Sequence, residues 1–436
     1  MDIRLVDLAQ AIGATFQPSL ATGIRVRGVC EDSRRITPGD LFVAIRGREQ
    51  DGTAFIPDAV RRGAVAVLAE DGASAPVPVL SVANPRVAMA RAAATLYGNP
   101  TSRLFTVGVT GTNGKTTTCH WIAELLEKER CALSSTVEPG EDGSGGLTTP
   151  SSPVLQRLAW RAVQRGADCL ILEASSAGIA QDRVSAVDFD VCALTNFSPE
   201  HRRHHGSVEA YLEAKLQLFR GLKTNGWAVL NADDPVCRQA AAATRGRVLT
   251  FGFSRDAALR CDQVRPEPRG MVLTVRPPAG TKPMELLLPF FGGYNVANAL
   301  AALAVASLRE VPWTQLADRM ASLHPVPGRA EVLRHPDGRT AIVDFAHNPA
   351  ALEAILADLS GRFARILLVV GCPGDGEHEK RVEMGQVSAR WAQEVILTSD
   401  NPGLEDPHAI AREIESGIAG AAGLVPFEAD RSTAVE

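Results

Sequence analysis

The sequence predicts an α/β fold with three domains and a mainly parallel central sheet. A chain of 436 residues is too long for one ordinary hydrophobic core. Strand-like apolar runs alternate with helical segments in the middle of the chain and again near its end, which is the pattern of parallel sheets covered by helices. One of these strands leads through a glycine-rich turn, residues 108–118, directly into a helix.

Turn residues mark two domain boundaries. The first lies at Asn99, Pro100 and Thr101, and the second lies in the proline-rich turn at residues 325–328. We therefore expect a small α/β N-terminal domain over residues 1–100, a central domain over 101–326 and a C-terminal domain over 327–436.

Each expected domain has its own strands. In the N-terminal domain, strand-like runs occur at 39–45, 64–68 and 77–80. In the central domain, strands are expected at 104–109, 168–173, 189–195 and 227–231, and helices at 116–129, 154–165, 208–222 and 295–308. Short β-like runs replace the helices between residues 245 and 290, and the C-terminal domain adds strands at 340–345, 365–370 and 394–398. The glycine-rich residues 140–146 are expected to form a surface loop.

Composition excludes several classes of function. A formal net charge of −5 argues against a general nucleic-acid partner, which would need a basic surface. The apolar runs are too short to span a bilayer, and the N-terminus lacks the apolar segment of a signal peptide. The eight cysteines are scattered, as expected for free thiols in a reducing compartment. These features predict a soluble cytoplasmic protein with neither nucleic acid nor membrane as partner.

The glycine-rich turn is the strongest functional motif. Glycines let backbone N–H groups approach an anion, and the helix that follows adds the partial positive charge of its N-terminus. Lys115 can reach terminal phosphates and Thr116 can offer a hydroxyl to Mg²⁺. Val109 stands where a strict P-loop has its first glycine, and a plain turn with one exposed lysine is the weaker alternative. We expect a nucleoside triphosphate here, contacted by Gly111, Thr112, Asn113, Gly114, Lys115, Thr116 and Thr117.

Polar side chains also follow the next two strands of the central domain. Glu173 ends one strand and His201 follows another, and the carboxyl ends of parallel strands meet at one edge of the sheet. Oxygen ligands suit Mg²⁺, so Glu173 and Thr116 are candidate ligands, with His201 as a third. The alternative for Glu173 is a helix cap. The histidines at 201–205 lack the spacing of a zinc site and favour a basic lip for an anionic substrate.

Three further groups of polar residues lie on predicted helices or at predicted strand ends. Lys215 is, on its helix alone, an ordinary surface lysine. Asn295 and Asn298 lie one helical turn apart, and their side-chain amides could form hydrogen bonds with the edge of a nucleotide base. An N-cap role for Asn295 is an equally weighted alternative. Polar residues at strand ends of the C-terminal domain predict that it faces the central domain across a cleft. These residues are Asp344, His347, Lys380, Arg381, Asp400 and Asn401.

Together these motifs resemble the Mur ligases, the ATP-dependent amide-bond ligases of peptidoglycan synthesis in the bacterial cell wall. The resemblance rests on the phosphate loop, Glu173-Ala-Ser-Ser, the pair Asn295 and Asn298, and Asp344-Phe-Ala-His347-x-Pro. Asp32-Ser-Arg34 and Lys215 in Glu-Ala-Tyr-x-x-Ala-Lys resemble the type that adds the third residue of the peptide. Nearly the whole chain takes part, in the expected order.

The resemblance implies a UDP-substrate-binding N-terminal domain, a central P-loop-type ATPase domain and a Rossmann-like C-terminal domain. It also implies that ATP and Mg²⁺ convert a carboxylate, in a UDP-sugar dipeptide or a diverged analogue, into an acyl phosphate that an amine attacks. The catalytic residues implied are Lys115, Glu173, His201 and Lys215, of which Lys215 would be carbamylated. Magnesium would be held by Thr116, Glu173, His201 and Lys215, and the nucleotide also by Asn295, Asn298, Arg329, Asp344 and His347. The substrates would meet Ser33, Arg34, Thr148, Thr149, Ser175, Arg183, Arg381, Asp400 and Asn401.

Departures from the family pattern gather on the substrate side. Ala177 replaces the usual histidine after Ser-Ser, Ala350 replaces an aspartate, and Gly403 replaces the arginine that marks enzymes using diaminopimelate. The chain ends at Glu436, before a further family motif, so a partner chain or dimer completing this region is one expectation. Alternatives are a ligase of a specialised pathway and a non-catalytic accessory protein. A folylpolyglutamate synthase-like enzyme is disfavoured, because such enzymes lack the Asp32-Ser-Arg34 domain.

Overall fold

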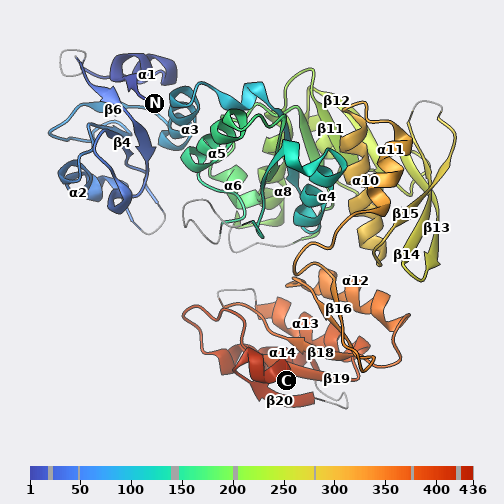
Figure 1. Cartoon of the computed structure of the whole chain (residues 1–436). Helices are drawn as coiled ribbons and strands as arrows, with labels where there is room; N and C mark the ends of the chain where they lie inside the picture. The colour runs from blue at the N-terminus through green and yellow to red at the C-terminus, as the bar shows by residue number, and fades with distance from the viewer. Residues whose placement is uncertain are drawn as a thin grey trace.

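The computed structural model describes residues 1–17, 23–47, 50–138, 147–199, 205–278, 281–374, 378–418 and 424–435. The chain forms three bodies in sequence order, with the N-terminal body on one side of the central one and the C-terminal body beneath it (Figure 1). The α/β fold class predicted from the sequence is confirmed. Each sheet lies within one of the three expected ranges.

The N-terminal body is built on a four-stranded parallel sheet in the order β3-β4-β5-β6. Every residue of β4 and β5 is buried, as expected for inner strands of a parallel sheet. The strands are β1 (Ile3–Arg4), β2 (Arg25–Val26), β3 (Gly28–Cys30), β4 (Asp40–Val43), β5 (Ala66–Ala69) and β6 (Val79–Ser81). The helices are α1 (Leu5–Ile12), α2 (Ile56–Arg61) and α3 (Pro85–Leu96), with the 3₁₀ turn η2 (Ser33–Arg35).

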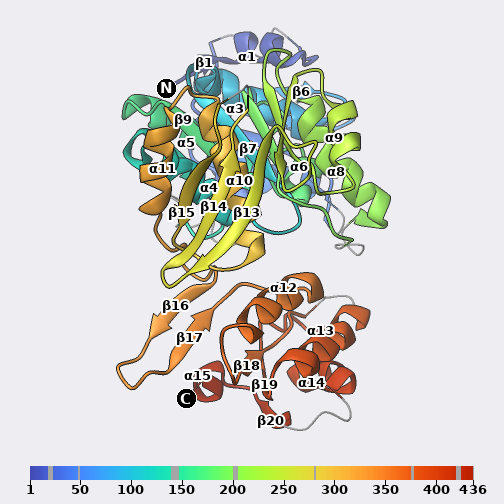
Figure 2. The same ribbon diagram turned by 90° about the vertical axis from the view of Figure 1, so that its right-hand side faces the viewer.

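The central body holds a nine-stranded sheet in the order β15-β14-β13-β12-β11-β10-β7-β9-β8. It is parallel from β8 to β13 and ends in an antiparallel meander, β13-β14-β15, which Figure 2 shows as long strands. The strands are β7 (Phe105–Thr110), β8 (Cys131–Ser134), β9 (Cys169–Glu173), β10 (Val191–Leu194), β11 (Trp227–Asn231), β12 (Arg247–Gly252), β13 (Leu259–Glu267), β14 (Gly270–Arg276) and β15 (Met284–Leu288). The helices are α4 (Lys115–Leu125), α5 (Ser152–Gln164), α6 (Ser176–Ala180), α8 (Val208–Arg220), α9 (Cys237–Ala243), α10 (Gly293–Ser307) and α11 (Trp313–Ala321).

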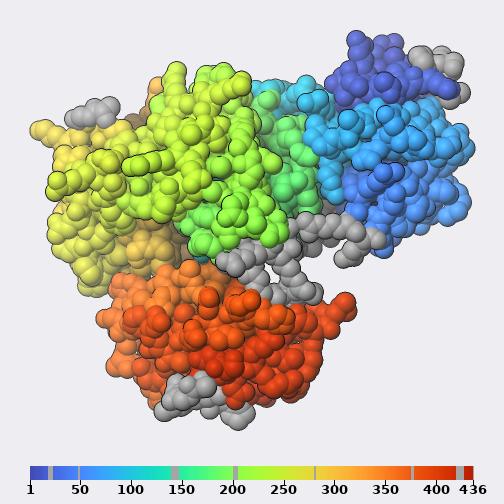
Figure 3. Space-filling model, turned by 180° about the vertical axis from the view of Figure 1, so that it is seen from behind, coloured from blue at the N-terminus to red at the C-terminus, as the bar shows by residue number. Residues whose placement is uncertain are grey.

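The C-terminal body consists of an antiparallel hairpin and a three-stranded parallel sheet, β18-β19-β20. Seen from behind, it touches the lower part of the central body (Figure 3). The strands are β16 (Glu331–Arg334), β17 (Thr340–Val343), β18 (Leu367–Val370), β19 (Glu394–Thr398) and β20 (Leu424–Glu428). The helices are α12 (Pro349–Ser360), α13 (His378–Trp391), α14 (Pro407–Ile418) and α15 (Arg431–Val435).

Two strands of the central sheet were not predicted from the sequence, and there is a physical reason in each case. The strand β13, with the sequence LRCDQVRPE, is mostly polar and carries a bulge between Cys261 and Gln263, so it lacks a clean alternation. The strand β8 has only four residues, and its apolar run of three, Cys-Ala-Leu, is too short to indicate a strand. The loop expected at residues 140–146 lies outside the described residues. In the part of the chain that the structure describes, no helix is long and apolar enough to cross a membrane.

The sheet order brings the predicted functional segments together. Strand β7 lies between β9 and β10, with Val109 beside Glu173 and Thr110 beside Leu194. The glycine-rich turn after β7 is therefore flanked by the ends of β9 and β10, where the sequence placed its other polar motifs. This is the edge at which open parallel sheets bind ligands.

A buried histidine beneath this edge makes stability depend on pH. His120 on α4 is 7% exposed and its Nε2 forms a 3.0 Å hydrogen bond with Ser135 Oγ. Burial, together with the positive charges of Lys128 and Arg329, lowers the pKa of His120 from 6.5 to about 4. The unfolded chain therefore binds this proton first as the pH falls, and stability is lost from about pH 6.5 downwards.

We expect the His120 imidazole to account for up to about 3 kcal/mol of the unfolding free energy lost between pH 7 and pH 4. Denaturant titrations of the wild type and of His120→Gln at several pH values measure this. The variant should lose less stability on acidification than the wild type does. Parallel pH profiles would show that His120 is not the group responsible.

Candidate functional site

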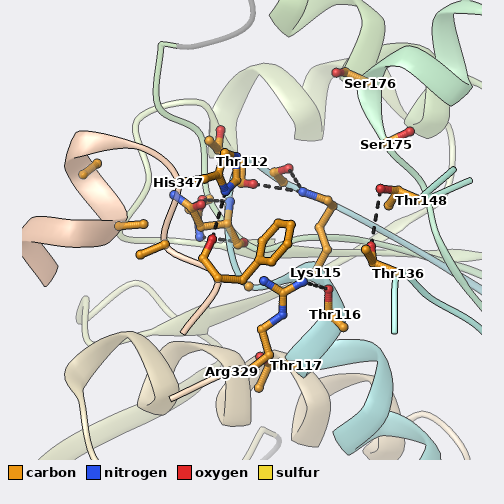
Figure 4. Close-up of a pocket in the computed structure, with 18 of the residues that line it drawn as sticks. Thr112, Lys115, Thr116, Thr117, Thr136, Thr148, Ser175, Ser176, Arg329 and His347 are labelled. Carbon is orange, nitrogen blue, oxygen red and sulfur yellow. Dashed lines mark hydrogen bonds between the residues drawn. The ribbon is translucent and has the colours of Figure 1, made fainter. Parts of the chain in front are cut away.

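A cavity of about 630 Å³ lies between the loops of the central body and the start of α12. Figure 4 shows Lys115 near its middle, with Arg329 and His347 on one side and Thr148 and Ser175 on the other. Fourteen of the predicted site residues line it: Gly111, Thr112, Asn113, Gly114, Lys115, Thr116, Thr117, Thr148, Ser175, Arg183, Lys215, Asn295, Asn298 and Arg329; two more, Asp344 and His347, come from the C-terminal body.

The glycine-rich turn adopts a backbone that only glycine accommodates at two points. Gly114 has φ +82°, and a Cβ there would lie 2.1 Å from Oδ1 of Asn298. Gly111 has φ +151°, and a Cβ there would lie 1.9 Å from Oγ1 of Thr195. Asn298 therefore packs directly against the loop from α10. The N-terminus of α4 begins at Lys115, so the loop and a helix end face the cavity together.

The loop is fixed by the segment that follows β10. The backbone carbonyl of Asn113 accepts hydrogen bonds from Thr195 Oγ1 at 2.6 Å and from Asn196 Nδ2 at 3.0 Å. The backbone N–H of Asn113 donates to Asn196 Oδ1 at 2.9 Å. These three hydrogen bonds fix the loop to the segment that follows β10, so the central sheet determines the position of the loop.

Two lysines converge on one carbonyl oxygen of the loop. Nζ of Lys115 donates to the carbonyls of Gly111 and Thr112 at 3.1 and 2.9 Å. Nζ of Lys215, from α8, donates to the same Gly111 carbonyl at 2.8 Å and lies 4.4 Å from the centre of the Tyr211 ring. Lys215 is 1% exposed, so the surface lysine that its helix pattern suggested is wrong for this position.

Glu173 is suited to hold a cation. It is 1% exposed, and its Oε2 accepts hydrogen bonds from Oγ1 and N of Thr136 at 2.6 and 3.1 Å. Its Oε1 is buried with no hydrogen-bond partner among the described residues, which is costly for a carboxylate unless an ion binds there. Ser175 is the N-cap residue of α6, so the alternative role of Glu173 as a cap is wrong. His201 lies outside the described residues.

The linker and the C-terminal body supply the opposite wall. Arg329 Nη2 donates to Thr116 Oγ1 at 2.9 Å, and its guanidinium lies 4.3 Å from the centre of the Phe345 ring. Burial, with Lys380 nearby, lowers the pKa of His347 to about 4, so its imidazole is neutral at physiological pH. Burial raises the pKa of Asp344, although the backbone N–H groups of Ala330 and Ala346 donate to its carboxylate.

The two asparagines of α10 have different surroundings. Both are 5% exposed and line the cavity. Asn295 Nδ2 donates to the carbonyl of Phe291 at 2.7 Å, and the N-cap residue of α10 is Gly292. The N-cap role considered for Asn295 is therefore wrong, and contact with a nucleotide stays a prediction for both residues.

The predicted substrate residues of the central body form one hydrogen-bonded group. Thr149 Oγ1 donates to the carbonyl of Glu173 at 2.7 Å, and the backbone N–H of Ser175 donates to Thr149 Oγ1 at 2.9 Å. Arg183 Nη1 donates to the carbonyl of Thr149 at 2.7 Å, and Thr148 Oγ1 lies 3.3 Å from Thr136 Oγ1. This group begins at the end of β9, directly beside the carboxylate of Glu173.

The remaining predicted substrate residues lie outside the cavity lining, and their roles stay predictions. Ser33 and Arg34 are in η2 of the N-terminal body. Arg381 is 1% exposed and pairs with Glu405 and Glu413 at 2.9 Å, which gives it a structural role in the C-terminal body. Asp400 pairs with Arg431 at 3.3 Å, and Asn401 accepts a backbone hydrogen bond from Gly374.

Sequence reasoning missed five residues that shape the cavity. Thr136 orients Glu173, Asn196 holds the loop, and Tyr211 forms a 3.2 Å hydrogen bond with Thr112 Oγ1. His205 Nε2 is 3.0 Å from Ser176 Oγ, and Asn348 reaches Asn113 from the C-terminal body. Four of these residues stand within or next to segments noted in the sequence: Asn196, Tyr211, His205 and Asn348. Nothing in the sequence indicated Thr136.

Comparisons with known proteins identify the family of this chain. The Mur ligase middle domain matches residues 109–306, the Mur ligase glutamate ligase domain matches 328–436, and the Mur ligase family catalytic domain matches 25–100. The UDP-N-acetylmuramoyl-L-alanyl-D-glutamate–2,6-diaminopimelate ligases of Geobacillus thermodenitrificans and Chromobacterium violaceum are 38% and 39% identical to this chain. These alignments cover 93% and 95% of this chain, and 85% and 86% of the relatives.

A solved structure of a ligase of the same description has a TM-score of 0.68 at 30% identity, covering 94% of this chain and 86% of the other. The resemblance seen in the sequence is thus confirmed in all three domains. With its phosphate loop, its buried Glu173 and Lys215 and its three-domain order, the chain belongs to the Mur ligase family.

Proposed function

We propose that this Mur ligase joins an amino acid to a free carboxylate of UDP-N-acetylmuramoyl-L-alanyl-D-glutamate, with hydrolysis of ATP to ADP and phosphate. One observation carries the proposal: a single cavity brings an anion-binding loop and a separate polar wall to the two sides of Lys115. The loop side suits triphosphate, and the wall with Thr148, Ser175 and Arg183 suits the donor. The donor and the product type follow the names of the relatives.

The chemistry that this arrangement supports has two steps. A donor carboxylate oxygen attacks the γ-phosphorus of ATP, and the bond to ADP breaks to leave an acyl phosphate. The amine nitrogen then attacks the acyl carbon, the carbon–oxygen bond to phosphate breaks, and the amine loses a proton. Lys115 at the centre of the cavity is placed to hold the transferring phosphoryl group, and the wall from α12 keeps water from the acyl phosphate.

Magnesium fits the residues present. The buried, unpaired Oε1 of Glu173 and the hydroxyl of Thr116 are oxygen ligands of the kind that Mg²⁺ prefers, and His201 remains a candidate. Bound Mg²⁺ would offset the negative charge of the phosphates. Thr136 holds the other oxygen of Glu173, which orients the carboxylate for this purpose.

Position 403 bears on the identity of the amine. The relatives' names specify 2,6-diaminopimelate. At position 403, where the family resemblance associates an arginine with that amine, this chain has Gly403. A panel of amines that includes diaminopimelate and L-lysine therefore belongs in the first assay. The non-catalytic accessory alternative is not favoured by the comparisons, because the similar proteins are named as ligases.

We expect the full-length protein to release ADP and phosphate only when ATP, Mg²⁺, the UDP-muramoyl dipeptide and a suitable amine are all present. Phosphate release and the mass of the product measure this. Because Lys115 is central, Lys115→Ala should lower the turnover rate by a factor of about 10² or more. Absence of product with every amine, while ATP still binds, would rule out the proposed ligation.

A matched pair of glutamate variants tests the metal site. Glu173→Gln removes the carboxylate charge and should raise the Mg²⁺ concentration needed for half-maximal activity. Glu138→Gln changes a carboxylate of the same region whose Oε1 lies 4.0 Å from Nε2 of His120, and it should leave that concentration unchanged. Equal magnesium requirements for the two variants would contradict the assignment of Glu173.

We further propose that Lys215 is carbamylated in the active enzyme. The ammonium group would first lose a proton. The neutral amine would then add to the carbon of CO₂, form a nitrogen–carbon bond and release a second proton, so a cation becomes an anion. The position supports this: Lys215 is buried and shares the Gly111 carbonyl with the ammonium group of Lys115. Replacing one of two neighbouring positive charges by a negative one is electrostatically favourable.

We expect protein equilibrated with ¹³C-bicarbonate to show a carbamate resonance that disappears in Lys215→Arg. The control is Lys223→Arg, at a lysine paired with Asp190 at 2.8 Å on the surface of the same body. The signal should survive in this control. A wild-type spectrum without the resonance, or one that persists in Lys215→Arg, would refute carbamylation at this site.

A further inference from the structure

One side chain of the C-terminal body reaches into the phosphate loop. Asn348 Nδ2 donates to Asn113 Oδ1 at 3.0 Å, across 235 positions of sequence. Asn348 is 1% exposed, although it lies at the junction of two bodies. It is also the N-cap residue of α12, where its Oδ1 accepts a hydrogen bond from the backbone N–H of Ala351 at 2.7 Å.

These two contacts define the orientation of both amides. A backbone N–H can only donate, so the atom of Asn348 that faces Ala351 is its oxygen and the opposite end is the NH₂ group. That NH₂ group requires an acceptor, so Asn113 presents its Oδ1 to Asn348. The polar side-chain atom that Asn113 can then offer to a ligand is Nδ2, a donor, which is the polarity that a phosphate needs.

We propose that Asn348 is a positioning residue for ATP binding, which holds the Asn113 amide with its donor available for the phosphates. Asn113 lines the cavity and Asn348 does not, so Asn348 acts through Asn113. Without Asn348, the Asn113 amide could rotate and place its oxygen against the anion. The inference rests on the proposed use of ATP, and it adds a residue to which the resemblance gave no role.

The same contact makes the phosphate loop depend on the position of the C-terminal body. Asn348 belongs to α12, whose residues Ala350, Ala351 and Ala354 line the cavity wall. The amide contact therefore forms only when α12 lies against the loop. Moving the C-terminal body away would release Asn113 and weaken its hold on the phosphates.

The test uses Asn348→Ser in the full-length protein. Serine keeps a helix cap, so α12 should keep its stability, but its side chain is too short to reach Asn113. We expect the variant to bind ATP about fivefold more weakly than the wild type, the effect of one lost hydrogen bond. Combining it with Asn113→Ala should cause no further loss beyond that of Asn113→Ala alone, because the two residues act as one unit.

Asn84→Ser is the matched control. Asn84 is the N-cap residue of α3, and its Nδ2 donates to Asp182 at 3.2 Å across the other junction between bodies. This variant should bind ATP as the wild type does, by calorimetry, and all variants should unfold within a few degrees of the wild type. Additive effects of the Asn113 and Asn348 variants, or unchanged ATP binding in Asn348→Ser, would overturn the inference. Wild-type protein that fails to bind ATP would instead refute the proposed function.

Discussion

The carbonyl oxygen of Gly111 accepts hydrogen bonds from both Lys115 and Lys215, and the chemistry of the cavity depends on this shared contact. It brings two ammonium groups, from α4 and α8, to one atom of the phosphate loop. Such a concentration of positive charge in a buried place favours an anion nearby, and triphosphate or a carbamate on Lys215 would supply one. Gly111 and Gly114 allow the positive φ angles of the loop, and the hydrogen bonds from the residues after β10 keep the loop in this shape.

The C-terminal body and the linker before it contribute side chains that contact the phosphate loop. Arg329 from the linker donates to Thr116, and Asn348 from α12 donates to Asn113, so two residues of the loop have partners beyond the central body. A ligase that forms a hydrolysable acyl phosphate benefits from such an arrangement, because the nucleotide site is complete only when the cavity is enclosed. In the proposed function, these contacts link the position of the C-terminal body to the binding of phosphate.

Much of this architecture could be read from the sequence, because strand ends of a parallel sheet lie at one edge. The phosphate loop and Glu173 lie at the ends of neighbouring parallel strands, so their convergence follows from the fold class. Asp344 and His347 instead follow β17, a strand of the antiparallel hairpin in the C-terminal body, so this rule does not explain their place in the cavity. Thr136 and Asn348 could not be found in this way, since their roles depend on which atoms face each other across separate segments. The ion pairs of Arg381 with Glu405 and Glu413 could not be found from its position after a strand end either, because they join separate segments of the C-terminal body.

Transfer of oxygen from the donor carboxylate to phosphate tests the central claim most directly. The dipeptide donor is labelled with ¹⁸O in both free carboxylates of its glutamate, and the phosphate released during ligation is analysed by mass spectrometry. If ATP activates one of these carboxylates as an acyl phosphate, each phosphate formed together with an amide bond carries one labelled oxygen. Ligation that proceeds with only unlabelled phosphate would show that the amide forms by another route.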